Sequence, residues 1–391
     1  MADVVPLSRG YSPPELATLL RALPNSSDEG LARWLALHPF SEATARYLEI
    51  HRLAPFAFHR LRTAGLLTRL PSSAQELLRA AYYTSAGQRA ALTEELGSLL
   101  ASFRSAGIDP IVLKGMALGA TVYPVPGARP ISDLDLLVER GQMPAVRQVL
   151  ADHGYKDEGL APEHHLAFGN HLHARRELAA GWQVAVEVHW NLVHDLRYAR
   201  HVQLAAMASR ACQVDFGSFQ ARVLDPSDQL LHAAAHLLQH SLNWNLLWLL
   251  DLRLLLDRYG VTWDWPALVA RAKELHLAGA LRYWLELADA MFGPCLPAEA
   301  CSALAEVEPD DEDKRRLAMA WGRPPRVGQL LWLRARGAGG WHARVTYLAQ
   351  TLFPPWSYMQ KRYRPASRWL TPLCYGWRVV AALRAVFRRA K

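Results

Sequence analysis

The sequence predicts an α+β fold, in which helical regions flank a small mixed β-sheet on both sides. Residues 11–105 and 225–316 carry helical patterning, whereas short β-branched runs alternate with helical segments from 108 to 225. With 51% hydrophobic residues, the 391-residue chain can fill cores of this extent. We therefore expect four parts: an N-terminal helical region over 1–105, an α/β core over 106–224, a helical domain over 225–320, and a basic, aromatic-rich helical tail over 321–391.

The N-terminal region carries helix-start signals. The segments 12–15 (Ser-Pro-Pro-Glu) and 71–73 (Pro-Ser-Ser) place proline where a helix begins. A long amphipathic pattern runs from Gln75 to Ala106 and ends at Gly107. We expect this helix to cover the sheet that follows.

The core is predicted from strand-like runs that alternate with helices. The runs cover residues 111–114, 134–138 and 182–189, with helices near 115–122 and from Pro144 to Gly154. This alternation fits a mixed sheet better than a sandwich of two sheets.

Two carboxylates stand one residue apart in the strand-like run. Side chains of a strand alternate between faces, so Asp133 and Asp135 point to one side and Leu134 to the other. Adjacent anions repel each other, and Mg²⁺ would neutralise both while it also binds substrate phosphates. The alternative is a half-exposed edge strand with two solvated aspartates.

Two further segments add candidate site residues. At Lys114 and Gly115 a buried strand feeds a helix, and the free N–H groups at such a helix end suit a phosphate. Glu187, in the run 182–190, would be a third carboxylate that binds a second metal ion or takes a proton from an attacking hydroxyl. Alternatively, Lys114 faces water and Glu187 is an ordinary exposed strand residue.

These segments together resemble the nucleotidyltransferase superfamily related to DNA polymerase beta. They are most similar to its branch of uncharacterised bacterial nucleotidyltransferases with a Leu-Lys-Gly element, here at 113–115, together with 123–138 and Glu187-Val-His189-Trp190. The resemblance implies that Asp133 and Asp135 hold Mg²⁺, that the Gly115 turn holds nucleotide phosphates, and that Glu187 is the third acidic residue. Met116 stands where the superfamily has serine or glycine, and the gap from Gly115 to Asp133 is longer than usual.

Arg129, just before the metal strand, would add positive charge for a polyphosphate. An arginine in a surface turn is the other interpretation. The resemblance implies transfer of a nucleoside monophosphate from an NTP to a hydroxyl or amine of an unidentified acceptor: a peptide, a small molecule, an RNA end or a protein. Two alternatives stay open: a catalytically silent homologue that binds nucleotide or a partner, and a basic RNA- or membrane-associated adaptor.

Histidines recur at two places outside these motifs. His164, His165, His171 and His173 lie close together in the sequence, and the last two share a strand face, a spacing compatible with a transition metal. Alternatively, these histidines are solvated or orient the acceptor. His232, His236 and His240 recur every four residues on a helix that Asp225 caps, with Asp228 as its capping-box acid and Trp244 and Trp248 continuing the row. We expect a polar stripe that borders the nucleotide or acceptor cleft.

The positive charge is concentrated in the tail. Residues 321–391 hold 14 of the 44 Lys and Arg residues and none of the 36 Asp and Glu residues, so the first 320 residues carry a net charge of 30 minus 36, or −6. These bases are mixed with Trp332, Trp341, Trp356, Trp369 and Trp377. The tail therefore fits an RNA-binding surface, a membrane-interface helix or an appendage docked on the acidic body, and we favour docking.

The four cysteines lack metal-module spacing, and we expect neither a disulfide framework nor a zinc module. The N-terminal residues show no signal-peptide pattern, and no apolar run reaches membrane-spanning length. These features predict a cytoplasmic protein without a transmembrane segment.

Overall fold

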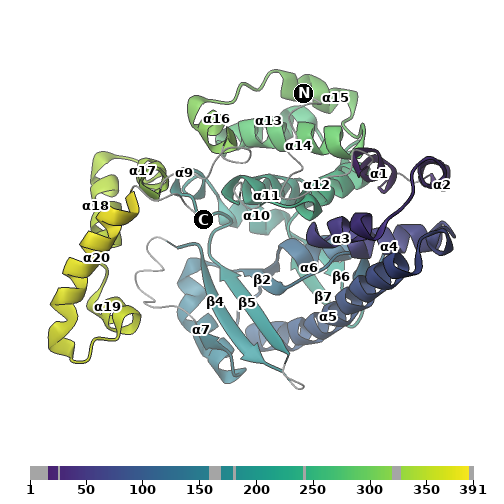
Figure 1. The fold of residues 1–391 in the computed structure, drawn as a ribbon. Helices are drawn as coiled ribbons and strands as arrows, with labels where there is room; N and C mark the ends of the chain where they lie inside the picture. The colour runs from purple at the N-terminus through teal and green to yellow at the C-terminus, as the bar shows by residue number, and fades with distance from the viewer. Residues whose placement is uncertain are drawn as a thin grey trace.

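The computed structural model of the chain describes residues 16–24, 27–157, 169–178, 182–240, 244–318 and 327–386. The predicted helix start at 12–15, His164 and His165 lie outside these residues. Within them, a mixed seven-stranded sheet is surrounded by helices, which confirms the α+β class (Figure 1).

The sheet has the order β3-β4-β5-β2-β1-β7-β6. The pairs β2/β5 and β1/β7 are parallel, and the other neighbours are antiparallel. The strands are β1 (Ile111–Val112), β2 (Asp133–Leu137), β3 (Lys156–Asp157), β4 (His171–Glu177), β5 (Gln183–His189), β6 (Cys212–Asp215) and β7 (Gln220–Val223).

The helices cover the predicted helical regions. Those of the N-terminal region and core are α1 (Leu16–Ala22), α2 (Asp28–Leu37), α3 (Glu42–Ile50), α4 (Ala54–Thr63), α5 (Ser72–Ser105), α6 (Lys114–Thr121), α7 (Met143–Asp152), α9 (Leu196–Ala199) and α10 (Leu204–Arg210). Those that follow are α11 (Pro226–Gln239), α12 (Leu246–Tyr259), α13 (Trp265–Glu274), α14 (Ala278–Phe292), α15 (Ala298–Ala305), α16 (Asp311–Ala318), α17 (Val327–Gly337), α18 (Trp341–Leu352), α19 (Trp356–Tyr363) and α20 (Thr371–Val386).

The long helix α5 covers one face of the sheet, as predicted. Its Leu96, Leu99 and Phe103 join one buried apolar cluster with Leu134 of β2 and Val186 of β5. The chain leaves the helix through Gly107, whose φ of 72° is a left-handed conformation that glycine adopts without steric cost. Because alternate residues of β2 and β5 face this cluster, their other side chains face the opposite side of the sheet.

A second buried cluster joins helices from both ends of the chain. Leu19 and Leu20 of α1 belong to the same cluster as Leu281 and Trp284 of α14, and Arg21 donates a hydrogen bond to the carbonyl of Ala290 at 3.1 Å. The predicted regions 1–105 and 225–320 therefore share a core over their described residues.

The tail begins on the body and then leaves it. Helix α17 contacts α9, where a Cβ on Gly337 would lie only 2.9 Å from the backbone nitrogen of Arg197. Figure 1 shows α18, α19 and α20 (yellow-green to yellow) to one side of the body. Among the described residues, no ion pair joins a base of 327–386 to an acid of the body, so charge pairing does not account for the α17 contact. No helix in the described part of the chain has both the length and the apolar character needed to cross a membrane.

Two expectations about the histidine helix were wrong. Asp225 caps α11 as predicted, but Asp228 is fully buried and pairs with Arg210 at 2.8 Å and Arg271 at 2.7 Å instead of closing a capping box. The row also does not continue into Trp248, because the helix ends at Gln239 and Trp248 lies on α12. Trp248 instead returns beside the row, with ring centroids 4.5 Å from His236 and 5.6 Å from His240.

Candidate functional site

The parallel pairing of β2 with β5 brings the three predicted carboxylates together. Asp135 stands opposite Glu187 and Asp133 opposite Ala185 in this register, while Leu134 points into the core on the other face. Cross-strand neighbours in register are close enough for their side chains to interact. The candidate site therefore lies on the sheet face that α5 leaves uncovered.

Two cationic or polar groups sit between the carboxylates. The ammonium Nζ of Lys114 lies 2.6 Å from Oδ1 of Asp135 and 3.4 Å from Oε2 of Glu187. Nε2 of His189 approaches the same two oxygens at 2.9 Å and 3.4 Å. Lys114 reaches this position from a left-handed backbone conformation at the start of α6, with a φ of 43°.

The pKa values divide the carboxylates into two kinds. Burial alone would raise the pKa of Asp135 and of Glu187, but Lys114 and His189 outweigh it, holding the pKa of Asp135 well below its ordinary value and that of Glu187 at about 2. Burial, helped by the negative charges of Asp135 and Glu187, instead raises the pKa of Asp133 to about 6. Asp133 accepts a hydrogen bond from Ser132 at 3.1 Å, and among the described residues it forms no ion pair. Asp133 is thus the carboxylate whose charge is least compensated.

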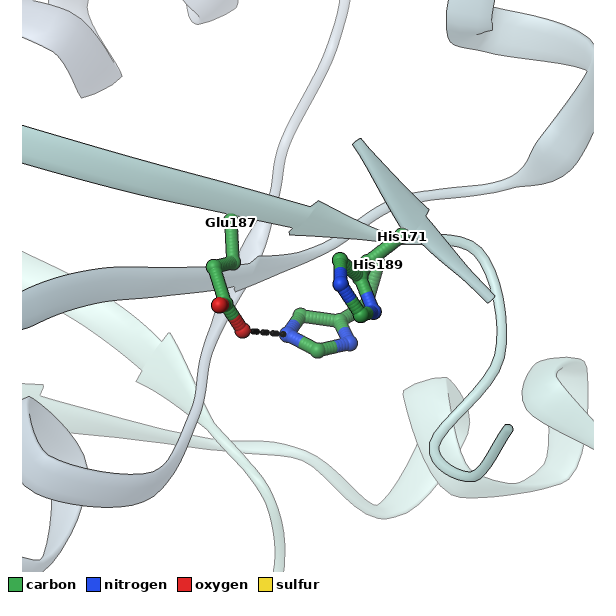
Figure 2. Close-up of side chains that lie close together, drawn as sticks. All are labelled: His171, Glu187 and His189. Atoms are coloured by element: carbon green, nitrogen blue, oxygen red, sulfur yellow. Dashed lines mark ion pairs between the residues drawn. The ribbon is translucent and has the colours of Figure 1, made fainter. Parts of the chain in front are cut away.

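His171 and His173 of the neighbouring strand β4 extend the cluster, and Figure 2 shows His171 beside Glu187 and His189 of β5. The candidate ligand atoms of His171, Glu187 and His189 all lie within 4.8 Å of one another. Nδ1 of His173 is 3.1 Å from Oε1 of Glu187, and its Nε2 is 2.6 Å from Nε2 of His171. Imidazoles beside a carboxylate suit a transition metal, whereas carboxylate oxygens alone suit Mg²⁺.

A cavity of about 370 Å³ opens in front of these groups. The charged side chains of Lys114, Asp133, Asp135 and Glu187 line it together with the predicted histidine row, which comprises His232, His236 and His240, and with Trp248. The row therefore borders the cavity that the three carboxylates line. His232 is 5% exposed, and its Nε2 has no hydrogen-bond partner among the described residues. Burial, with the positive charge of Lys114, lowers the pKa of His232 to about 3, so its imidazole is neutral at pH 7.

Arg129 and Gly115 also line the cavity, and they pack against each other. The guanidinium of Arg129 makes a bidentate pair with Asp251 of α12, at 2.8 Å from Nε and 2.6 Å from Nη2. Asp251 also accepts a hydrogen bond from Tyr123 at 2.7 Å. A Cβ on Gly115 would lie 2.7 Å from Nη1 of Arg129, so glycine is needed for this close approach. Arg129 is therefore a buried group, not a surface-turn arginine, and it fixes the turn to α12.

Arg52, which the sequence did not single out, is another cation of the cavity wall. It follows α3 in a left-handed conformation with a φ of 61°, and among the described residues its side chain has no hydrogen bond or ion pair. Burial and the positive charge of Arg129 lower the pKa of Arg52, only partly offset by Asp133 and Asp251. Its position in a turn between two helices gave no motif, because its link to the site is tertiary.

The charges of the wall do not balance. Asp133, Asp135 and Glu187 contribute −3, and Lys114 and Arg52 contribute +2, which leaves −1, since Arg129 is neutralised by Asp251. A divalent cation beside the carboxylates would bring the wall to +1. That remaining positive charge would suit an anion such as a phosphate.

Comparisons with known proteins gave one family match and two structural likenesses. The model of a protein family described as "Uncharacterised nucleotidyltransferase" matches residues 41–293. The chain has a structural likeness to an antigenic nucleotidyltransferase-like protein from Paracoccidioides brasiliensis, at 14% identity and a TM-score of 0.34, covering 54% of this chain and 95% of that one. A second likeness is to a tRNA-processing enzyme, at 11% identity and a TM-score of 0.21, covering 74% of this chain and 89% of that one. The comparison with curated proteins found no match.

Proposed function

The chain belongs to the family of uncharacterised nucleotidyltransferases, whose model matches more than half of it, and we propose that it is a Mg²⁺-dependent enzyme that moves a nucleoside monophosphate from an NTP to a hydroxyl of an acceptor. The observation that carries this proposal is the cluster of Asp133, Asp135 and Glu187 on one sheet face beside the cavity. An amine, in place of the hydroxyl, is a second possible nucleophile of the acceptor.

Asp133 and Asp135 would hold the Mg²⁺ ion, with Glu187 as the third acidic residue. Their fit to a hard cation rests on two features: carboxylate oxygens are the ligands that Mg²⁺ prefers, and Asp133 lacks a compensating cation among the described residues. When bound, the ion would neutralise triphosphate oxygens and stabilise the leaving pyrophosphate. Lys114 would keep Asp135 and Glu187 ionised for this purpose.

In the proposed reaction, the acceptor oxygen forms a bond to the α-phosphorus, and the bond from that phosphorus to the oxygen bridging it to the β-phosphorus breaks. Pyrophosphate leaves with the electron pair of that bond. The hydroxyl proton passes to the pair formed by Glu187 and His173, whose atoms are 3.1 Å apart. The carboxylate would orient the imidazole, as in other carboxylate–histidine pairs.

The nucleotide would lie along the cavity wall, with its phosphates between the Gly115 turn and Arg52. The first turn of α6 offers N–H groups at Gly115, and Arg52 offers a guanidinium that no described residue pairs. Arg129 would act by positioning, since Asp251 holds its guanidinium against the Gly115 turn. The wall of His232, His236 and Trp248 would contact the base or the acceptor, whether this is a peptide, a small molecule, an RNA end or a protein.

The test combines labelled NTPs, Mg²⁺ and a lysate of the source organism, and it measures pyrophosphate release and label transfer. Asp133→Asn is the most informative variant, because it removes a metal ligand without breaking an ion pair among the described residues. Turnover should fall at least about 100-fold, while the melting temperature is unchanged or higher. Asp215→Asn is the control, an equal substitution at an exposed residue of β6 outside the cavity.

Two outcomes would count against the transferase proposal. Pyrophosphate release that survives in Asp133→Asn contradicts the transferase proposal. Nucleotide binding without pyrophosphate release, in the presence of every lysate fraction, identifies a silent nucleotide-binding homologue instead. Met116 favours that alternative, because it is buried in the core and supplies no hydroxyl for a phosphate.

A further inference from the structure

Helix α20 and the short 3-10 helix that precedes it, Arg368–Leu370, carry an apolar stripe that faces solvent. Its members are spaced by three, four, three and three residues, which places them on one helical face. They are Leu370, Leu373, Trp377, Val380 and Leu383, exposed by 42%, 69%, 59%, 41% and 63%. Such a stripe is normally buried against another element.

One more exposed apolar side chain adjoins the stripe. Trp369, just before α20, is 86% exposed. We call Trp369 and the stripe together the tail surface. Phe353 and Trp356 are exposed as well, but they lie beside Tyr375, on another side of α20. Large exposed apolar patches mark interaction sites on soluble proteins.

The charge around the tail surface is of one sign. The described tail, residues 327–386, contains nine Lys and Arg residues and no Asp or Glu: Arg334, Arg336, Arg344, Lys361, Arg362, Arg364, Arg368, Arg378 and Arg384. Arg378 is held by the carbonyl of Thr351 at 2.7 Å. Arg368 and Arg384 lie on the same elements as the stripe, so a partner that covers the stripe also meets positive charge there.

This requirement separates the candidate partners. A second copy of the tail would bring two sets of cations together. An RNA strand would neutralise the arginines and stack on tryptophans, but it offers no environment for Leu373, Val380 or Leu383. The headgroup region of an anionic bilayer meets both requirements, because tryptophan and leucine side chains partition below the phosphates that pair with arginine.

We propose that the tail surface binds the surface of anionic phospholipid membranes, with α20 lying in the interface plane. This binding goes beyond nucleotide transfer and requires no nucleotide. It would hold the body, and the cavity in it, next to the membrane.

The test is co-sedimentation of the full chain with vesicles of phosphatidylcholine alone or of phosphatidylcholine and phosphatidylglycerol at three to one, without nucleotide. Binding should be at least tenfold stronger to the anionic vesicles and should fall in 0.5 M salt. The double variant Leu373→Glu/Leu383→Glu should bind at least tenfold less. The control Leu37→Glu/Val261→Glu places the same charge at exposed apolar residues of the body and should bind like the wild type.

Several results would overturn the proposal. These are equal binding by Leu373→Glu/Leu383→Glu and the wild type, equal binding to neutral and anionic vesicles, and binding to single-stranded RNA without binding to vesicles. A dimer that Leu373→Glu/Leu383→Glu converts to monomer, in a protein that ignores vesicles, would assign the stripe to a second copy. Unchanged melting temperatures of both double variants show that the comparison concerns surfaces and not folding.

Discussion

Replacing Arg52 by glycine is expected to stabilise the fold and to weaken nucleotide binding. Arg52 has a left-handed conformation, with a φ of 61°, which costs a non-glycine residue about 1–2 kcal/mol and which glycine adopts without this cost. Glycine also makes the unfolded chain more flexible, which lowers the gain in stability by about 0.5–1 kcal/mol. The free energy of unfolding should therefore rise by about 0.5–1 kcal/mol. Loss of one charge-assisted hydrogen bond to a phosphate should weaken binding of a non-hydrolysable NTP with Mg²⁺ by about 10- to 100-fold.

The chain provides a matched control in His276→Gly. His276 has a φ of 57° and the same pair of backbone bonds at a helix end as Arg52, but it is exposed and lies outside the cavity. It should gain similar stability and leave nucleotide binding unchanged. Melting temperature and calorimetric titration measure the two effects. A lower melting temperature for Arg52→Gly, or nucleotide affinity equal to that of His276→Gly, would refute the reasoning.

Further predictions concern the pair that fixes the turn, the acid range and the metal. Arg129→Met should lower the free energy of unfolding by about 3–5 kcal/mol, because it leaves Asp251 buried and unpaired, and Arg129→Met/Asp251→Leu should recover most of it in denaturant titrations. Burial and Asp310 raise the pKa of Asp313 to about 6, so the folded protein keeps this proton at a pH where the unfolded chain has lost it. The free energy of unfolding should therefore fall by about 2 kcal/mol as the pH rises from 4 to 6, relative to Asp313→Asn, in thermal melts. EDTA should abolish pyrophosphate release, and Mg²⁺ or Mn²⁺ should restore it; recovery by neither ion would contradict a divalent-metal site.

The parts of the site that follow from local periodicity were predictable. Alternation along one strand placed Asp133 and Asp135 on a common face, and the strand that carries Glu187 was recognised by its β-branched residues. The register that sets Glu187 opposite Asp135 was not predictable from the sequence. It pairs segments about fifty residues apart and depends on the packing of both strands against α5. Strands β6 and β7 were not assigned at all, since each is four residues long.

Tertiary contacts also changed roles that local patterns had assigned. Asp228 has the spacing of a capping-box acid, but two arginines from other segments outcompete the backbone N–H for its carboxylate. Arg129 has the sequence context of a surface turn, and only the return of α12 brings Asp251 to it. In both cases a buried charged side chain pairs with a residue that is distant in the sequence, and the pattern of one segment alone does not predict such a pair.

Backbone strain connects these observations to the proposed site. Among the described residues, four that are not glycine have a positive φ, and two of them, Arg52 and Lys114, are cations of the same cavity wall. Glycine or asparagine would adopt these conformations at lower energy, but neither would supply the positive charge that Arg52 and Lys114 bring to the wall. Lys114 offsets one of the three carboxylates, and Arg52, which no described residue pairs, adds a second positive charge to the wall. The strain and the unbalanced charge thus coincide at one wall, as expected of a site that binds a metal nucleotide.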